Sequence, residues 1–279
     1  MTANGKWRIF AFSEQKLSPS IFVYNFPELQ LKNELKGTAQ LDYTSLALCD
    51  GGPYLACCSS LPDHTITVWN WENAESVCTQ PQAGKDVTSL VFNPQNWFQL
   101  CALGTTHLTV WNIEKSSCLL CCSVIELPAT DGSFVERLSP TPYLVSNKLS
   151  NWLQRCLLSL KGDKELLLSP LLTPSAICWT ATSELCVGCA EGFLLLVDPE
   201  SFSVSVLFNP TSKQTCTLGC GRYLKTLAYL LQESMVHCLQ IKGTQIDIEQ
   251  TWQLERAVKT VMYSPDQETL LLSSKSVST

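Results

Sequence analysis

One short apolar stretch recurs along the chain at nearly constant spacing, and this recurrence limits the folds that the chain can adopt. Its clearest copy is Asp63–Trp71, in which a turn acid precedes β-branched residues and a Trp-Asn pair lies near the end. Related runs occupy Leu108–Ile113, 42 residues further on, and Ile21–Phe26, 45 residues earlier. Weaker copies occupy Phe193–Asp198 and Met235–Ile241. A chain with this period builds the same small unit several times.

The repeated unit has the strand pattern of a WD40 propeller blade. A hydrophobic strand that returns every ~40–45 residues and ends in Trp-Asp or a near relative is typical of such blades. Short apolar runs lie between the copies, separated by turns such as Asp50–Pro53 and Asn93–Asn96, as in antiparallel hairpins. Aligning Ser45–Leu48 with Ser89–Phe92 requires an offset of 44 residues, so two consecutive units match along their length. The sequence therefore predicts an all-β fold, a WD40-type β-propeller.

The number of units predicts an incomplete ring. The chain opens at Trp7–Phe12 in the pattern of a second strand, runs through four fuller units, and stops after Leu270–Leu272, before the matching Trp strand. Since propellers have roughly four to eight blades, we expect an open or poorly closed arc of about five blades with one strand missing at each seam. Two apolar blade faces are then exposed, which favours a partner, a second copy or further blades.

The repeat is interrupted between residues 127 and 174. This part is rich in proline and lacks the Trp strand, and apolar residues within it recur at i, i+3, i+4, i+7, i+8 and i+11. The pattern predicts an amphipathic helix over 148–161, with Ser146 or Asn147 as its cap and Gly162 after its end. The chain therefore divides into propeller blades at 1–126, an insertion at 127–174 and further blades at 175–279. The apolar face of the helix either packs on its own propeller or docks a partner, and comprises Leu149, Trp152, Leu153, Cys156, Leu157 and Leu160.

Charge and hydropathy exclude several classes of partner. The 279 residues carry a formal net charge of −6, and lysines and arginines do not cluster beyond pairs, so the basic surface that nucleic acid requires is missing from the sequence. No apolar run approaches the ~20 residues of a membrane span. Residues 1–8 lack the apolar core and cleavage site of a signal peptide. We therefore expect a cytosolic chain that binds no nucleic acid, membrane or small-molecule substrate.

The fifteen cysteines raise the alternatives of disulfides and metal binding. In a cytosolic chain of this length reduced thiols are expected, and most of these cysteines lie in strand-like runs, where Cys behaves as a small hydrophobe. The pairs Cys118/Cys121 and Cys186/Cys189 have Cys-x-x-Cys spacing, but in extended backbone positions i and i+3 point to opposite faces, whereas zinc sites need converging thiols. We expect thiols throughout, no metal and no other cofactor.

Catalytic motifs are absent from the sequence. It has no Gly-x-Ser-x-Gly elbow and no Gly-rich phosphate loop before a helix. The adjacent Asp63 and His64 diverge in extended or turn backbone. An aromatic cage is one interpretation of Trp69 and Trp111, but their repeated position indicates instead that each fills the space between two blades. The sequence predicts a protein that is not an enzyme.

Several residues occupy equivalent positions of the repeat and are expected to be structural. Regular WD40 blades join an Asp, a His, a Ser or Thr and the Trp in a buried polar network. Here Gly37-Thr38 stands where a Gly-His pair is needed, so we expect that network to be incomplete and packing to hold the blades. The repeat positions are Tyr24, Asp63, Trp69, Trp111 and Asp198.

A set of short motifs resembles a known family. Ser-Leu-Pro-Asp before the Trp strand and Asn-Trp-Glu after it occur together, which is more specific than a generic Trp-Asp. The full set of motifs is Phe12–Leu17, Val23–Pro27, Leu35–Gly37, Leu41–Thr44, Ser59–Pro62, Trp69–Glu72, Phe92–Trp97, Gln99–Cys101, Cys178–Thr180, Gly188–Cys189 and Glu191–Gly192. Through these motifs the sequence resembles the ciliary WD-repeat proteins of the cilia- and flagella-associated family over most of its length, apart from the insertion.

The resemblance implies a place and a role. Members of the family are non-catalytic components of the axoneme, in a complex that tethers an inner-arm dynein to the doublet microtubule of motile cilia and the sperm flagellum. The implied partners are other axonemal proteins, including the dynein-tether complex and sister WD-repeat proteins. A cytosolic WD40 adaptor, acting in trafficking or as a ubiquitin-ligase substrate receptor, is the alternative.

The insertion helix yields a first prediction. If the helix packs on its own propeller, Leu153→Asp lowers the free energy of unfolding by several kcal/mol, because the new charge is buried and unpaired. If the helix docks a partner, the same change leaves stability intact and abolishes a pull-down. Chemical denaturation and pull-down of the same variant distinguish the two outcomes. A strand at 148–161 would contradict both.

Overall fold

The computed structural model describes residues 1–37, 39–105, 107–114, 119–125, 127–128, 172–180, 182–208, 216–219, 227–232, 235–242, 245–255, 258–263 and 270–274. All the long regular elements within these residues are β-strands. They form five four-stranded antiparallel sheets and one two-stranded sheet, and neighbouring strands of each sheet are consecutive in sequence. The predicted all-β class is confirmed. The helix predicted over 148–161, with all its apolar-face residues, lies outside the described residues.

Each four-stranded sheet is one blade, and each is named here by its order in the chain. The first blade contains β1 (Thr2–Asn4), β2 (Ile9–Ser13), β3 (Ile21–Asn25) and β4 (Leu31–Leu35). The second contains β5 (Tyr43–Leu48), β6 (Tyr54–Ser59), β7 (Ile66–Asn70) and β8 (Glu75–Gln80). The third contains β9 (Val87–Phe92), β10 (Gln99–Gly104), β11 (Leu108–Glu114) and β12 (Leu119–Ile125).

The remaining strands follow the insertion. The fourth blade contains β13 (Pro174–Trp179), β14 (Leu185–Cys189), β15 (Leu194–Val197) and β16 (Val204–Phe208). The fifth contains β17 (Cys216–Gly219), β18 (Leu227–Gln232), β19 (Met235–Lys242) and β20 (Gln245–Gln253). The two-stranded sheet pairs β21 (Val258–Tyr263) with β22 (Leu270–Ser274).

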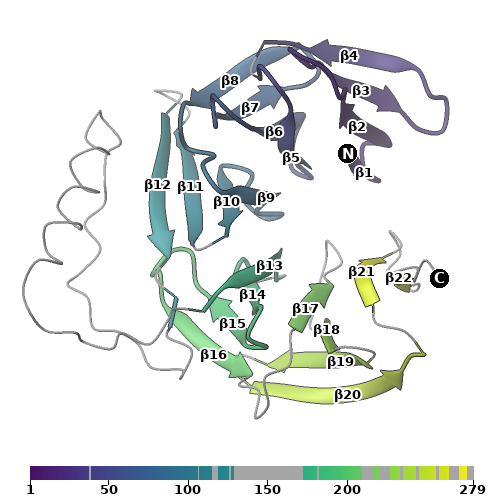
Figure 1. Cartoon of the computed structure of the whole chain (residues 1–279), viewed down its shortest axis with the longest axis vertical. Helices are drawn as coiled ribbons and strands as arrows, with labels where there is room; N and C mark the ends of the chain where they lie inside the picture. Colours follow the sequence, from purple (N-terminus) through teal and green to yellow (C-terminus); the bar gives the residue numbers. More distant parts are fainter. Residues whose placement is uncertain are drawn as a thin grey trace, which may run out of the picture.

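The blades are arranged around a central axis as an open arc (Figure 1). The first strands of successive sheets, β1, β5, β9, β13, β17 and β21, contact one another in that order along the inner side. The first blade and the two-stranded sheet stand at the two ends of the arc and do not meet (Figure 1). The expected open arc is therefore confirmed.

The seam at the start of the chain differs from the prediction. The first blade was expected to lack its innermost strand, but Thr2–Asn4 forms β1 and pairs with Ile9–Ala11 of β2. Asn4 is buried, and its Nδ2 donates hydrogen bonds to the carbonyl of Cys49 (3.0 Å) and to Asp50 Oδ1 (2.5 Å). The missing-strand prediction was wrong because this strand is held by a polar side chain rather than by the apolar residues that mark strands in sequence.

The two ends of the insertion lie side by side. The amide of Leu172 donates a hydrogen bond of 3.0 Å to the carbonyl of Pro128. Leu127 and Leu172 are both buried in the core between the third and fourth blades. The described chain after β12 and the described chain before β13 therefore meet at one place.

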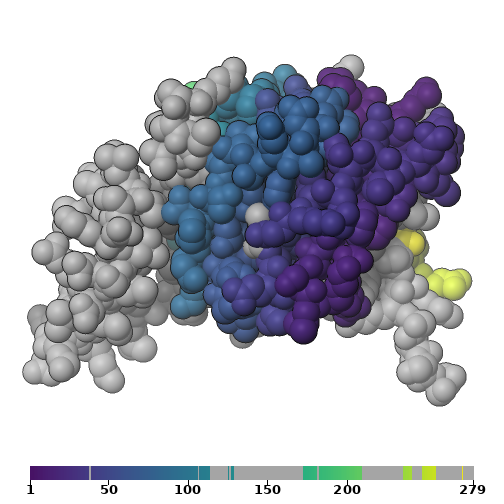
Figure 2. All heavy atoms as spheres, turned by 90° about the horizontal axis from the view of Figure 1, so that it is seen from above, coloured from purple at the N-terminus to yellow at the C-terminus, as the bar shows by residue number. Residues whose placement is uncertain are grey.

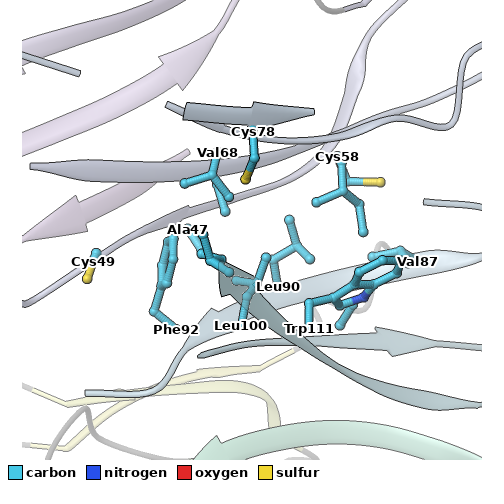
Figure 3. Packing of buried hydrophobic residues seen from close by; sticks show 14 residues of the cluster. Ala47, Cys49, Cys58, Val68, Cys78, Val87, Leu90, Phe92, Leu100 and Trp111 are labelled. Atoms are coloured by element: carbon cyan, nitrogen blue, oxygen red, sulfur yellow. The ribbon is translucent and has the colours of Figure 1, made fainter. Parts of the chain in front are cut away.

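Three cores join the first four blades. Ile9, Ala11, Ile21 and Val23 of the first blade pack against the Trp69 face of the second. Between the second and third blades, Val68, Cys78 and Cys58 face Leu90, Leu100 and Trp111 (Figure 3). The third core joins the third blade to the fourth. Viewed from above, the first three blades form one continuous packed body (Figure 2).

The repeated Trp has different hydrogen bonding in two neighbouring blades. In the third blade Trp111 Nε1 donates to Thr109 Oγ1 at 3.0 Å, and this hydroxyl donates onward to the carbonyl of Ala102 at 3.4 Å. Thr67 and Trp69 occupy the same positions in the second blade, yet Thr67 Oγ1 and Trp69 Nε1 are both buried without a hydrogen-bond partner. One of the two equivalent hydroxyls is therefore hydrogen-bonded and the other is not.

This contrast yields a matched pair of substitutions. Thr109→Val removes the acceptor of a buried indole N–H, and we expect a loss of about 1–3 kcal/mol in the free energy of unfolding. Thr67→Val replaces an unpaired buried hydroxyl with a methyl group of similar size, so stability should be unchanged or increased. Urea denaturation of both variants checks the prediction. An equal loss in both would contradict it.

A stack of three aromatic rings joins the second and third blades at one end. The rings of Tyr54 and Trp97 lie 3.8 Å apart with an interplanar angle of 13°, and Phe98 stacks on Trp97 at 3.8 Å. The stack lies against the turn before β6. A Cβ added to Gly52 would lie 2.6 Å from Tyr54 Cε2, whereas one added to Gly51 would contact the Trp97 side chain at an ordinary 3.4 Å.

These two glycines yield the next prediction. Gly52→Ala should lower the free energy of unfolding by about 1–3 kcal/mol, because the ring of Tyr54 is held by Trp97 and cannot move aside without strain. Gly51→Ala serves as the control, since its methyl group fits, and it should change stability by less than the Gly52 variant. Thermal and urea denaturation measure both. A Gly51 variant as unstable as the Gly52 variant would show that the turn, not the ring, sets the limit.

Among the cysteines whose side chains the structure describes, all but one are thiols. Cys49, Cys57, Cys58, Cys78, Cys101, Cys186, Cys189 and Cys238 are buried cysteines outside disulfides. Cys178 on β13 is disulfide-bonded, so the expectation of thiols throughout was wrong. The prediction treated each cysteine within its own strand and took no account of neighbours in space.

Candidate functional site

Three of the predicted repeat positions, Tyr24, Trp69 and Trp111, lie at equivalent places on the third strands of the first three blades. Trp69 on β7 and Trp111 on β11 are buried, and each faces the preceding blade. Tyr24 holds the same position on β3, but its ring is half-buried and lies on the free side of the first blade. These three residues are not brought together into one site.

Asp63 ties two loops together. Its Oδ1 accepts a hydrogen bond of 2.9 Å from Gln40 Nε2, and its Oδ2 accepts one of 3.2 Å from the Gln40 amide. Gln40 belongs to the connection between the first and second blades, and Asp63 to the turn before β7. The carboxylate thus fastens this connection to the second blade.

Asp198 is held within its own turn, directly after β15. It accepts hydrogen bonds from Ser201 Oγ (2.5 Å) and from the amide of Glu200 (2.9 Å). These bonds, that from Ser201 foremost, hold the pKa of the Asp198 carboxyl below its ordinary value. The carboxylate is charged and already bonded at neutral pH.

The Cys-x-x-Cys pair on β14 does not converge. Cys189 packs in the core between the third and fourth blades, and Cys186 is not part of that core. Burial raises the pKa of the Cys186 thiol to about 12, so the thiolate that a metal or a substrate would need is strongly disfavoured. Across the described parts of the chain, no group of three or more His, Cys, Asp or Glu side chains is placed to hold a metal ion.

A polar cavity of about 330 Å³ lies between the third and fourth blades. The β9–β10 turn forms one wall, and the β13–β14 and β15–β16 turns form the other. Ser183 Oγ donates to Asn93 Oδ1 at 3.3 Å across the two blades. The lining consists of amides, hydroxyls and carboxylates, which suits hydrogen-bond donors, and comprises Asn93, Asn96, Gln99, Thr182, Ser183, Glu184, Asp198, Pro199 and Glu200.

The first blade carries an apolar array of four rings, here called the aromatic face. It consists of Phe10 and Phe12 on β2 with Phe22 and Tyr24 on β3. Phe10 pairs with Tyr24 and Phe12 with Phe22, so all four side chains lie on the same side of the sheet. Ring centroids lie 5.6 Å apart for Phe10–Tyr24, and 5.8 Å apart for both Phe12–Phe22 and Phe12–Tyr24.

The aromatic face is not part of the cores between the described blades. The four rings are half-buried and belong to none of the three cores. Leu31, which pairs with Tyr24 across β4, extends the apolar surface and is 51% exposed. Glu34 pairs with Phe22 and is bridged to Lys36 at 2.9 Å. Stacked aromatic rings on an accessible sheet face are suited to binding another protein surface.

Most of the aromatic face was missed as a functional feature in the sequence. Only Tyr24 was singled out, and as a repeat position. The signal was present, because large aromatic residues alternate with small or β-branched ones in both Ile9–Phe12 and Ile21–Tyr24. This alternation does not distinguish a strand with both faces covered from a strand with one face accessible to solvent.

Among the residues that the structure describes, no helix is long and apolar enough to span a bilayer.

Comparison with known proteins gives two kinds of similarity, the first to curated sequences. No protein-family model matches the chain. It is 34% identical over 289 residues to cilia- and flagella-associated protein 43 of Xenopus laevis, which covers 95% of this chain and 18% of that protein. It is 30% identical over 298 residues to the Mus musculus protein of the same name, covering 98% and 17%. A shorter match, 31% over 104 residues, is to cilia- and flagella-associated protein 44 of Mus musculus, covering 37% of this chain and 6% of that protein. The chain thus spans less than a fifth of the length of these relatives.

The second similarity is to solved structures and concerns the fold alone. The β-propeller domain of Cps50 (Swd1) from Myceliophteria thermophila matches with a TM-score of 0.69 at 14% identity, over 99% of this chain and 79% of that one. A chain of the Mitotic Checkpoint Complex matches with a TM-score of 0.63 at 10% identity, over 98% and 70%. These matches confirm the β-propeller class.

Proposed function

We propose that this chain, an arc of WD40-type propeller blades similar over nearly its whole length to part of cilia- and flagella-associated protein 43, is a non-catalytic protein–protein interaction scaffold of the cilium and flagellum. The similarity over 95% of the chain carries the proposal, and it agrees with the resemblance drawn from the motifs. The finer form of the proposal follows that resemblance: the chain acts in the axoneme of motile cilia and the sperm flagellum, in a complex that tethers inner-arm dynein to doublet microtubules.

The geometry supports a binding role. The first blade leaves the aromatic face partly exposed, while buried polar side chains such as Asn4 and Thr109 make hydrogen bonds that stabilise the blades themselves. The carboxylates of Asp63 and Asp198 are fixed by hydrogen bonds within loops, in an arrangement that supports structure rather than proton transfer. Rigid blades that display loops and an apolar face are suited to holding other proteins in place.

A cytosolic WD40 adaptor, acting in trafficking or as a ubiquitin-ligase substrate receptor, is the second candidate. The observation in its favour is that the fold is shared with a chain of the Mitotic Checkpoint Complex. That likeness concerns the architecture of the blades, whereas the sequence similarity concerns their residues, and the ciliary proposal is therefore preferred.

Localisation in multiciliated cells tests the proposal. We expect a tagged 279-residue chain to remain with axonemes after detergent extraction and to cross-link to inner-arm dynein or its tether. Circular dichroism of the purified chain controls for folding, and immunoblotting of whole cells controls for expression. Recovery of the folded chain in the soluble cytosol, with trafficking or ubiquitin-ligase subunits cross-linked to it, would favour the adaptor instead.

A further inference from the structure

Two buried side-chain amides line the polar cavity between the third and fourth blades. Asn93 and Gln99 are 2% and 6% exposed, and both line the cavity. Asn93 Nδ2 donates to Gln99 Oε1 at 2.9 Å, and Gln99 Nε2 donates to Asn112 Oδ1 at 3.4 Å. A carboxamide nitrogen carries two N–H groups, so each of these amides keeps a second N–H that makes no hydrogen bond within the described chain. A buried donor of this kind is costly unless an acceptor reaches it.

Three carboxylates complete the polar lining, those of Glu184, Asp198 and Glu200. Glu184 Oε2 accepts a hydrogen bond of 2.8 Å from Thr182 Oγ1, and Asp198 is held by the bonds within its own turn. Their oxygens retain lone pairs, because a carboxylate accepts about four hydrogen bonds. The described lining contains no Lys, Arg or His, and the ion pairs of the described chain involve none of these carboxylates. The cavity therefore gathers three negative charges without a basic side chain of the described chain beside them.

The geometry limits the kind of cation that fits. Since no group of three or more His, Cys, Asp or Glu side chains in the described chain is placed to hold a metal ion, a metal is not the ligand indicated. The volume of about 330 Å³ is at the lower end of the ~300–1,000 Å³ of small-molecule pockets, which suits one long side chain rather than a cofactor. A guanidinium is planar, carries five N–H donors in a fixed fork and is more weakly hydrated than an ammonium. It can therefore bond several separated carboxylates at once.

We propose that this cavity binds an arginine side chain of a partner protein. The guanidinium lies against the carboxylates of Glu184, Asp198 and Glu200, and a carbonyl oxygen of the partner accepts the spare N–H of Asn93 or Gln99. Both the buried donors and the unpaired charges of the cavity are then satisfied by one segment of the partner.

The site depends on the seam between the two blades. Its walls come from the β9–β10 turn on one side and from turns of the fourth blade on the other, and the bond from Ser183 Oγ to Asn93 Oδ1 joins them. The third and fourth blades are neighbours along the arc (Figure 1). The inference concerns the chemistry of this seam and does not depend on where the protein acts.

Titration of the 279-residue chain with short peptides, followed by NMR, tests the proposal. The probe is the tripeptide acetyl-Gly-Arg-Gly-amide, compared with the same peptide carrying citrulline, a neutral isostere of arginine, or lysine. The arginine peptide should shift the side-chain amide signals of Asn93 and Gln99 and the backbone signals of Thr182 and Ser183. The citrulline peptide should leave them unchanged, and added salt should weaken the binding of the arginine peptide.

A matched pair of variants assigns the binding to the cavity. Glu200→Gln removes one charge from the lining and should weaken binding of the arginine peptide about fivefold. Glu72→Gln removes the same charge at an exposed position on the second blade and should bind like the unchanged chain. Circular dichroism checks that both variants fold.

Four outcomes overturn the proposal. They are no shift of the cavity signals, equal shifts with the citrulline peptide, equal weakening by the two variants, and equal binding of the lysine peptide, which would remove the preference for a guanidinium. Because the peptides probe the cavity alone, each of these outcomes would leave the proposed scaffold role in the cilium unaffected.

Discussion

Apolar packing between neighbouring blades is the interaction on which the structure depends. Each blade by itself is a thin antiparallel sheet that buries little, and it becomes stable only when both faces are covered. Side chains alternate between the two faces along each strand, so each blade presents a different set of residues to each of its neighbours. Because the blades repeat the same strand pattern, Trp69 and Trp111 each pack against apolar residues of the preceding blade. The polar contacts are additions to this packing. The Thr109–Trp111 bond exists in one blade and its counterpart at Thr67 and Trp69 does not, yet both blades have the same shape.

Much of the fold could be predicted from the sequence because packing of this kind leaves a periodic trace. The strands Tyr43–Leu48, Val87–Phe92 and Val258–Tyr263 fall where their apolar runs place them. The elements that the sequence did not reveal are those held by other forces. β1 depends on hydrogen bonds of Asn4, and β8 is an outermost strand with mostly accessible side chains, so neither has a strong apolar pattern. The disulfide at Cys178 depends on a neighbour in space, which no spacing within one strand can show.

The candidate site was less predictable than the fold. The sequence predicted Asp63 and Asp198 as repeat positions only. In the structure Asp63 binds Gln40 of another loop and Asp198 binds Ser201 within its own turn. No sequence pattern identifies these hydrogen-bond partners. The aromatic face was not recognised, because a strand whose second face is free and one whose second face is covered by a distant blade have the same alternation. Only the position of the first blade at the end of the arc distinguishes the two cases.

The contact between Pro128 and Leu172 affects how the chain tolerates a change in the number of residues between them. The bond between Leu172 and Pro128, with Leu127 and Leu172 anchored in the core, brings both ends of the intervening segment to a single point on the rim. The geometry of the blades is then independent of the number of residues between those ends. Such a point is a natural place for sequence to be gained or lost during evolution, and for a reporter domain to be spliced into the chain without moving a blade.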